Sequence, residues 1–353
     1  VSCRRVGVTN PADVPDPDRL HDAMVRRLHR RSVVTGEIRL PAVPGLIDEY
    51  VAMCEKIFSA VGSAFSADQV AHLRSVLQGQ LDSAYGASQR SDIAISFNSP
   101  VGTVLNYSVK PESMTIDETY ENWVATRQPP LFGTEPDARV WALANETTDP
   151  GSFPVLDIGA GTGRNALALT RRGHPVDVVE VTATFANMIR ATVQQESLNV
   201  RVFQRNVFTT SEGLRHDYQL ILLSEVVPEF RTPEELRKMF ELAANHLAPG
   251  GRLVFNTFMA KDGLVVDGAT RQLSEQVYSN LFTWDEVNRG VLGLPLDLVA
   301  DDSVHEYEEA NLPAGAWPPT GWYSGWVAGQ DLYDLPREQC PNEMRWLVYQ
   351  KRG

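Results

Sequence analysis

The segment from residue 155 to residue 164 constrains the fold of this 353-residue chain more than any other part of its sequence. Residues 155–158 (Val-Leu-Asp-Ile) form a short, mostly apolar run that is typical of a buried parallel strand and contains Asp157. Three glycines at alternating positions separate this run from a helix start at Arg164: Gly159, Gly161 and Gly163. A strand, a glycine turn and a helix start in this order predict an α/β sheet whose bare backbone admits a ligand at the turn.

Further apolar runs follow at the spacing of alternating strands and helices, and they predict strands at 175–180, 200–203 and 218–223. Residues 247–255 are predicted to contain a helix end, a turn and a fifth strand. The second predicted strand ends in Glu180, about 20 residues beyond the glycines, where an acidic side chain can accept hydrogen bonds from a ribose diol. The third leads to Asn206, and the fourth leads to Ser224 and Glu225. Because the carboxyl ends of parallel strands share one edge of a sheet, these side chains are expected around one site.

The spacing at the glycine turn resembles motif I of class I S-adenosylmethionine (SAM)-dependent methyltransferases, in which an acidic residue precedes the first glycine by two positions. A dinucleotide-binding fingerprint would require glycine at position 164, where this chain has arginine. Residues 247–253 (Leu-Ala-Pro-Gly-Gly-Arg-Leu) are similar to the L-x-P-G-G-x-L motif of the same family. The resemblance spans roughly residues 115 to 351. It implies an α/β fold with a Rossmann-like, seven-stranded methyltransferase sheet.

The activity that this resemblance implies is SAM-dependent methyl transfer to a small-molecule acceptor by in-line SN2 displacement, as in bacterial stand-alone enzymes, with SAM as the cofactor. Two alternatives stay open. One is a protein or peptide methyltransferase, and the other is a SAM-binding regulatory or assembly protein without turnover.

The resemblance also implies roles for individual residues around the cofactor. Glu180 is expected to bind the ribose hydroxyls, and Asn206 the adenine amino group, at a position where the family often has aspartate. Tyr120 and Arg127 belong to a segment that is expected to fold over the cofactor, with Arg127 facing the SAM carboxylate; the alternative is that this segment only packs a helix against the sheet. The predicted cofactor-binding residues are Asp157, Gly159, Ala160, Gly161, Gly163, Glu180, Val181, Asn206, Val207, Ser224, Tyr120 and Arg127.

Methyl transfer from a sulfonium requires an aligned nucleophile and often a base that removes a proton. Glu225 and Glu229 follow the fourth predicted strand, and His305 lies on a predicted sixth strand at 298–307, so these three are the candidate bases. Glu225 has an alternative role in supporting the cofactor or capping a helix. No metal site is predicted, although a metal-assisted variant with Glu225, His305 and Glu308 is a weaker alternative.

The segment 316–326 lies between the predicted sixth strand and a last strand at 344–349, and it is rich in tryptophan, proline and glycine. Aromatic side chains in such a loop tend to line ligand sites, because they offer a large rigid surface with a polar tip. The predicted acceptor-binding residues are therefore Trp317, Trp322, Tyr323 and Trp326. A hydrophobic plug or an oligomer contact is the alternative.

Residues 1–114 are predicted to form a separate helical unit with a short β-ribbon, and residues 115–353 the methyltransferase domain. The helical periodicity covers 18–31, 44–61 and 67–84, and the ribbon strands are expected at 93–97 and 103–107. This first unit is predicted to act as a lid or as an oligomer or substrate contact.

The formal net charge is −13, from 32 Lys and Arg against 45 Asp and Glu, and such an acidic surface disfavours a nucleic-acid substrate. The sequence has no apolar run long enough to predict a membrane span. Three scattered cysteines favour a reducing compartment. We therefore expect a cytoplasmic protein with a small-molecule acceptor, no nucleic-acid or membrane partner, and a possible homo-oligomer through the N-terminal unit.

Overall fold

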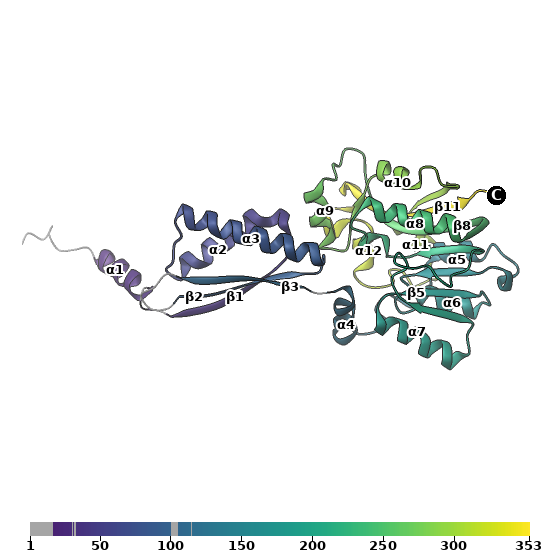
Figure 1. The fold of residues 1–353 in the computed structure, drawn as a ribbon, viewed down its shortest axis with the longest axis horizontal. Helices are drawn as coiled ribbons and strands as arrows, with labels where there is room; N and C mark the ends of the chain where they lie inside the picture. Colours follow the sequence, from purple (N-terminus) through teal and green to yellow (C-terminus); the bar gives the residue numbers. More distant parts are fainter. Residues whose placement is uncertain (1–16, 30, 32, 100–104, 114) are drawn as a thin grey trace, which may run out of the picture. The chain divides into compact units, whose positions relative to one another are not determined.

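The computed structural model describes residues 17–29, 31, 33–99, 105–113 and 115–353 (Figure 1). The chain divides into two compact units, Val1–Ser113 and Met114–Gly353. Each unit has a hydrophobic core of its own.

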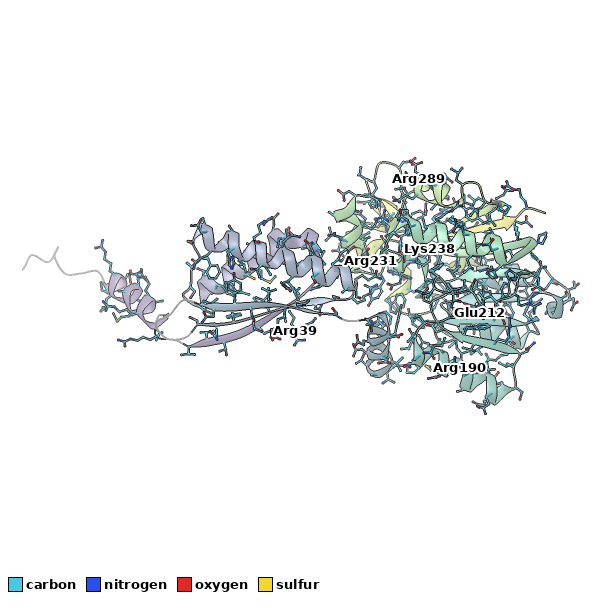
Figure 2. All side chains as sticks on the ribbon, in the orientation of Figure 1. Arg39, Arg190, Glu212, Arg231, Lys238 and Arg289 are labelled. Carbon is cyan, nitrogen blue, oxygen red and sulfur yellow. The ribbon has the colours of Figure 1, made fainter. Side chains whose placement is uncertain are left out.

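The first unit is built on a three-stranded antiparallel sheet in the order β1-β2-β3. Its elements are α1 (Pro17–His29), β1 (Val34–Pro41), α2 (Ile47–Ala60), α3 (Ala67–Ala87), β2 (Asp92–Ser99) and β3 (Asn106–Glu112). Helices α2 and α3 lie along one face of the sheet (Figure 1), and Phe58, Leu73 and Ile95 are fully buried between them. Arg39 of β1 lies on the face that these helices leave uncovered (Figure 2), where it forms ion pairs with Glu37 and Glu112.

The sequence-based account of this unit is incomplete in one respect. Strand β1 was not predicted, so the expected two-stranded ribbon is a three-stranded sheet. Strand β3 begins at Asn106, later than the predicted start at residue 103, and residues 100–104 lie outside the described residues.

The second unit contains the predicted Rossmann-like sheet. Its strands are β4 (Val155–Ile158), β5 (Val176–Glu180), β6 (Val200–Gln204), β7 (Tyr218–Leu223), β8 (Leu247–Ala260), β9 (Leu281–Phe282), β10 (Leu296–Ser303) and β11 (Asn342–Lys351). The order is β10-β11-β8-β7-β4-β5-β6, with β9 paired to β8 off this path. Strand β11 runs antiparallel between β8 and β10, while β4 to β8 pair in parallel. The strand order reverses beside β4, and a crevice at the carboxyl ends of strands is expected there.

Helices cover both faces of this sheet, so each central strand is apolar on both sides. In β7, Leu220 and Leu222 belong to one core cluster, while Ile221 and Leu223 belong to the other. The helices of this unit are α4 (Ile116–Thr126), α5 (Ala138–Ala144), α6 (Arg164–Arg171), α7 (Ala183–Glu196), α8 (Pro233–His246), α9 (Gly268–Glu275), α10 (Trp284–Val291), α11 (Val304–Asn311), α12 (Tyr323–Val327) and α13 (Gln330–Tyr333). This two-sided burial explains why the strands were visible as continuous apolar runs.

The predicted sixth strand at 298–307 is wrong at its carboxyl end. Strand β10 stops at Ser303, whose hydroxyl accepts a hydrogen bond from the Glu306 amide and caps α11. His305 therefore lies in the first turn of a helix and not on a strand. No helix among the described residues has the length and apolar character needed to cross a membrane.

Candidate cofactor and acceptor site

The turn between β4 and α6 has a backbone that suits glycine. Gly159 and Gly161 have φ angles of 71° and 54°, a region that other residues rarely adopt. A Cβ atom on Gly159 would lie 2.4 Å from Cγ2 of Val226, which follows β7. The alternating glycines therefore let the β4 turn pass close to the segment after β7.

The Glu180 carboxylate connects this turn to the end of β5. Its Oε2 accepts a hydrogen bond from the Gly161 amide at 2.8 Å, and its Oε1 accepts one from the Thr182 amide at 2.8 Å. Burial raises the pKa of Glu180, and these amides oppose that effect. Since each carboxylate oxygen has a second lone pair, Glu180 retains acceptor capacity for a diol.

Asp157 lies deeper in the same wall and is 2% exposed. Burial, reinforced by Asp137 and Glu180, raises the pKa of Asp157 to about 8. Its Oδ2 has no hydrogen-bond partner among the described residues. An ammonium group would compensate such a carboxyl by favouring its ionised form, so this wall fits the amino-acid part of SAM.

A cavity of about 880 Å³ opens at the carboxyl ends of the strands, within the second unit. Eleven of the twelve predicted cofactor-binding residues line it: Tyr120, Arg127, Asp157, Gly159, Ala160, Gly161, Glu180, Val181, Asn206, Val207 and Ser224. Gly163 does not; it precedes α6, where an added Cβ would meet Leu167 and Ile189. Asn206 uses one lone pair of its Oδ1 locally, to accept a hydrogen bond from the Phe208 amide at 2.9 Å.

An aromatic group lines one side of the cavity, with two rings from α4, one from α7 and one from the segment after α9. The Tyr120 ring centroid lies 5.4 Å from those of Trp123 and Phe185, and Trp123 lies 5.4 Å from Tyr278. The Arg127 guanidinium lies 3.6 Å from the Trp123 ring centroid. The two alternatives for the segment of Tyr120 and Arg127 are therefore compatible, because its side chains pack together and also line the cavity.

The aromatic loop contributes to the cavity through only part of its predicted set. Trp322 and Trp326 line the cavity, whereas Trp317 and Tyr323 do not. The Trp326 indole donates a hydrogen bond to the Val277 carbonyl at 3.1 Å, which fixes its orientation. Tyr323 is buried behind these rings, and Trp317 packs against Tyr323 and His305.

Of the three candidate bases, Glu225 and Glu229 line the cavity and His305 does not. The Glu225 side chain is 16% exposed, and its Oε1 accepts a hydrogen bond from Arg164 at 3.1 Å. Its backbone has a φ of 61°, and its amide donates to Asn256 Oδ1 at 2.6 Å. Burial and the Asp137 charge raise the pKa of Glu225 to about 7, although Arg164 opposes this shift.

The metal-assisted alternative finds no support in the position of Glu308. Its carboxylate accepts hydrogen bonds from the Ala138 and Arg139 amides at the start of α5, and one from the Trp346 indole. Among the described residues, no group of three or more His, Cys, Asp or Glu is arranged to hold a metal ion.

Two buried residues of the site were not predicted. Arg164 forms an ion pair with Asp137 at 2.6 Å in addition to its contact with Glu225. Arg164 occupies the position at which a dinucleotide fingerprint has glycine, and that substitution was the available signal. Asp137 precedes α5 in an irregular segment, where no periodicity marks a buried side chain.

Comparison with known proteins agrees with this architecture. Residues 155–251 match the family model described as a methyltransferase domain. No curated protein sequence matches the chain significantly.

Three solved structures are similar in fold. A putative sarcosine dimethylglycine methyltransferase from Galdieria sulphuraria shares 16% identity over 61% of this chain and 84% of its own, with a TM-score of 0.45. Geranyl diphosphate C-methyltransferase from Streptomyces coelicolor A3(2) shares 15% identity over 61% of this chain and 80% of its own, with a TM-score of 0.46. The [4+2]-cyclase SpnF shares 14% identity over 61% and 80%, with a TM-score of 0.42. Identities of this size say nothing about a shared substrate.

Proposed function

Residues 155–251 form a class I SAM-dependent methyltransferase domain, and from this premise we propose that the protein methylates an uncharged or cationic small molecule, with Glu225 as the base. One observation carries the proposal. A single cavity brings the glycine turn and Glu180 together with an aromatic wall and the Glu225 carboxyl. Its volume of about 880 Å³ lies at the upper end of the range for ligand pockets, as expected for a site that takes a donor and an acceptor together.

The donor side of the cavity is formed by the ends of β4 and β5. Glu180 binds the ribose hydroxyls, Asp157 faces the ammonium group, and Arg127 faces the carboxylate. SAM, when bound, supplies an electrophilic methyl group on its sulfonium. The aromatic group of Tyr120, Trp123 and Phe185 excludes water from this side, which strengthens the electrostatic contacts within it.

Glu225 removes the proton that the acceptor loses on methylation. Arg164 engages Oε1 of this carboxylate, and no hydrogen bond to its Oε2 occurs among the described residues, so Oε2 is available to the acceptor. A pKa of about 7 leaves a large fraction of Glu225 ionised at neutral pH, which suits a general base.

The charges around the cavity support an acceptor without negative charge. Six carboxyl groups line the cavity: Asp157, Glu180, Glu225, Glu229, Glu235 and Asp331. Its three arginines already have protein partners: Arg127 contacts Trp123, Arg164 pairs with two carboxylates, and Arg205 donates to the Glu212 carbonyl. A phosphate or carboxylate on the acceptor would therefore meet net repulsion.

Calorimetric titration of the full chain with SAM and with S-adenosylhomocysteine tests the donor site. Binding should also raise the melting temperature, because a ligand that binds only the folded state stabilises it. Turnover of labelled SAM with pools of neutral, amine and anionic metabolites then tests the chemistry. The absence of any binding would contradict the proposal, and binding without turnover would favour a regulatory protein.

Replacing Trp322 with alanine is expected to raise the KM for the acceptor by about 10-fold or more, with a much smaller effect on the KM for SAM. Removing a buried aromatic contact from a binding site commonly costs about 1–3 kcal/mol. Trp317→Ala is the matched control, because this tryptophan belongs to the same loop but does not line the cavity. Equal effects of Trp322→Ala on both substrates would contradict its assignment to the acceptor.

We propose a cytoplasmic protein that forms a homo-oligomer through residues 1–114, which also act as a lid or substrate contact. Sedimentation of the full chain and of a variant without these residues tests the assembly: an unchanged oligomeric state in the shortened chain would contradict it.

A further inference from the structure

A buried polar cluster lies directly behind the Glu225 carboxyl, and Asp137 is at its centre. Asp137 is 1% exposed, and its carboxylate accepts three side-chain hydrogen bonds. Arg164 donates to Oδ1 at 2.6 Å, and Asn165 and Ser224 donate to Oδ2 at 2.8 and 2.6 Å. These three donors occupy most of the acceptor capacity of the Asp137 carboxylate.

The Arg164 guanidinium is shared between two carboxylates. One terminal nitrogen contacts Asp137 Oδ1 at 2.6 Å, and the other contacts Glu225 Oε1 at 3.1 Å. The shorter contact goes to Asp137, which is the more deeply buried of the two acids. One arginine therefore pairs with two carboxylates, and its ion pair with Glu225 is the longer and weaker of the two.

Asp137 is itself fixed by its neighbours in the sequence and in the fold. Its backbone amide donates to Asn165 Oδ1 at 2.9 Å, which is a second bond between these two residues. Asn165 follows Arg164, and Ser224 precedes Glu225, so the Asp137 carboxylate contacts the chain next to both members of the ion pair. Asp137 does not line the cavity.

We propose that Asp137 is a positioning residue for methyl transfer: it retains one arm of Arg164 and leaves Glu225 incompletely neutralised, so that Glu225 remains able to take up a proton. This inference rests on the proposed function, in which Glu225 is the base. Without Asp137, Arg164 would pair with Glu225 alone and hold it as a stable carboxylate, which is a poor base.

Three other titratable side chains surround this cluster, and none of them replaces Asp137 as the partner of Arg164. Tyr323 of α12 is buried beside Glu225, and Glu308 of α11 and Asp157 of β4 are acidic groups near Asp137 and Arg164. Burial raises the pKa of each of these three side chains, to about 8 for Asp157 and about 7 for Glu308, which disfavours their charged forms. Asp137 makes the shortest contact of any carboxylate with Arg164, at 2.6 Å.

The test is a pH titration of the Glu225 carboxyl in the full chain, in which the chemical shift of ¹³C-labelled glutamate is measured by NMR at each pH. Glu225→Gln identifies the signal by its loss. The expected midpoint is about 7 in the unaltered protein, and Asp137→Asn should lower it by about one pH unit, because the variant removes a nearby negative charge. The acidic limb of the rate profile should move in the same direction.

Asp177→Asn is the matched control. Asp177 is also a buried aspartate bonded to an arginine, Arg201 at 2.6 Å, but it does not line the cavity. This variant should leave the Glu225 midpoint unchanged. An Asp137→Asn protein that folds and keeps the original midpoint would overturn the inference.

Ser224→Ala provides a second variant in case Asp137→Asn does not fold. It removes one donor from Asp137, which then attracts Arg164 more strongly, so the Glu225 midpoint should rise; an unchanged or lower midpoint overturns the inference. The NMR titration needs no turnover. A shifted midpoint in a protein that never methylates would count against the proposed function alone, whereas turnover with an unshifted midpoint would count against Asp137 alone.

Discussion

Gly161→Val is expected to lower the affinity for SAM and S-adenosylhomocysteine by about 100-fold or more while leaving the methyltransferase domain folded. Gly161 has a φ of 54°, which costs an ordinary residue about 1–2 kcal/mol. An added Cβ would lie 3.4 Å from the Phe132 ring, inside the cavity, and the two valine methyl groups would extend beyond it. The change would also disturb the Gly161 amide that donates to Glu180, so both the space and the ribose-binding carboxylate are affected. Calorimetric titration measures the loss.

The control for backbone strain is Gly263→Val. Gly263 also has a positive φ, of 92°, but a Cβ there would meet no atom within 4 Å, and the residue does not line the cavity. This variant should lose similar stability and retain its affinity for SAM. If Gly161→Val binds SAM as tightly as the unaltered protein, the glycine turn is not part of the cofactor site.

The sheet of the second unit could be predicted from the sequence because its central strands are buried on both faces. Such strands appear as continuous apolar runs, and the predicted strand at 155–158 has the observed bounds. Strand β1 gave a weaker signal, because it contains glycine and proline, which are depleted in strands. The error at His305 has a similar origin: Ser303 acts as a helix cap within a run that also fits a strand.

The site could be predicted only where a residue type marks its own role. The cofactor-binding side of the cavity could be predicted from its glycines and from the acidic residues at strand ends. The tryptophan-rich composition of 316–326 indicated a cavity wall, but not which of its side chains face the cavity. Trp322 and Trp326 do so, whereas Tyr323 is buried in the core beside them. Asp137 is recognisable only from the tertiary contacts of its carboxylate.

Glu225→Gln is expected to lower kcat by about 10²- to 10⁴-fold, the usual contribution of a general base, with little change in the affinity for S-adenosylhomocysteine. Glutamine retains the size of the side chain and can still accept a hydrogen bond from Arg164, but it cannot take up a proton at neutral pH. In the unaltered protein the rate should rise as the pH increases through about 7, because burial raises the pKa of Glu225 to that value and only the ionised form is a base. The variant should lose this limb of the profile.

Glu229→Gln is the control that shows whether the loss of activity is specific to Glu225 or follows from removing any carboxylate of the cavity. Glu229 lines the same cavity from the turn of Val227–Glu229, four residues further along the chain, and it forms no ion pair with Arg164 among the described residues. Its variant should keep most of the activity and the limb near pH 7. The reverse result, in which Glu229→Gln abolishes turnover and Glu225→Gln keeps both rate and profile, would assign the proton transfer to Glu229. The Arg164 cluster would then be a structural support of the cavity wall.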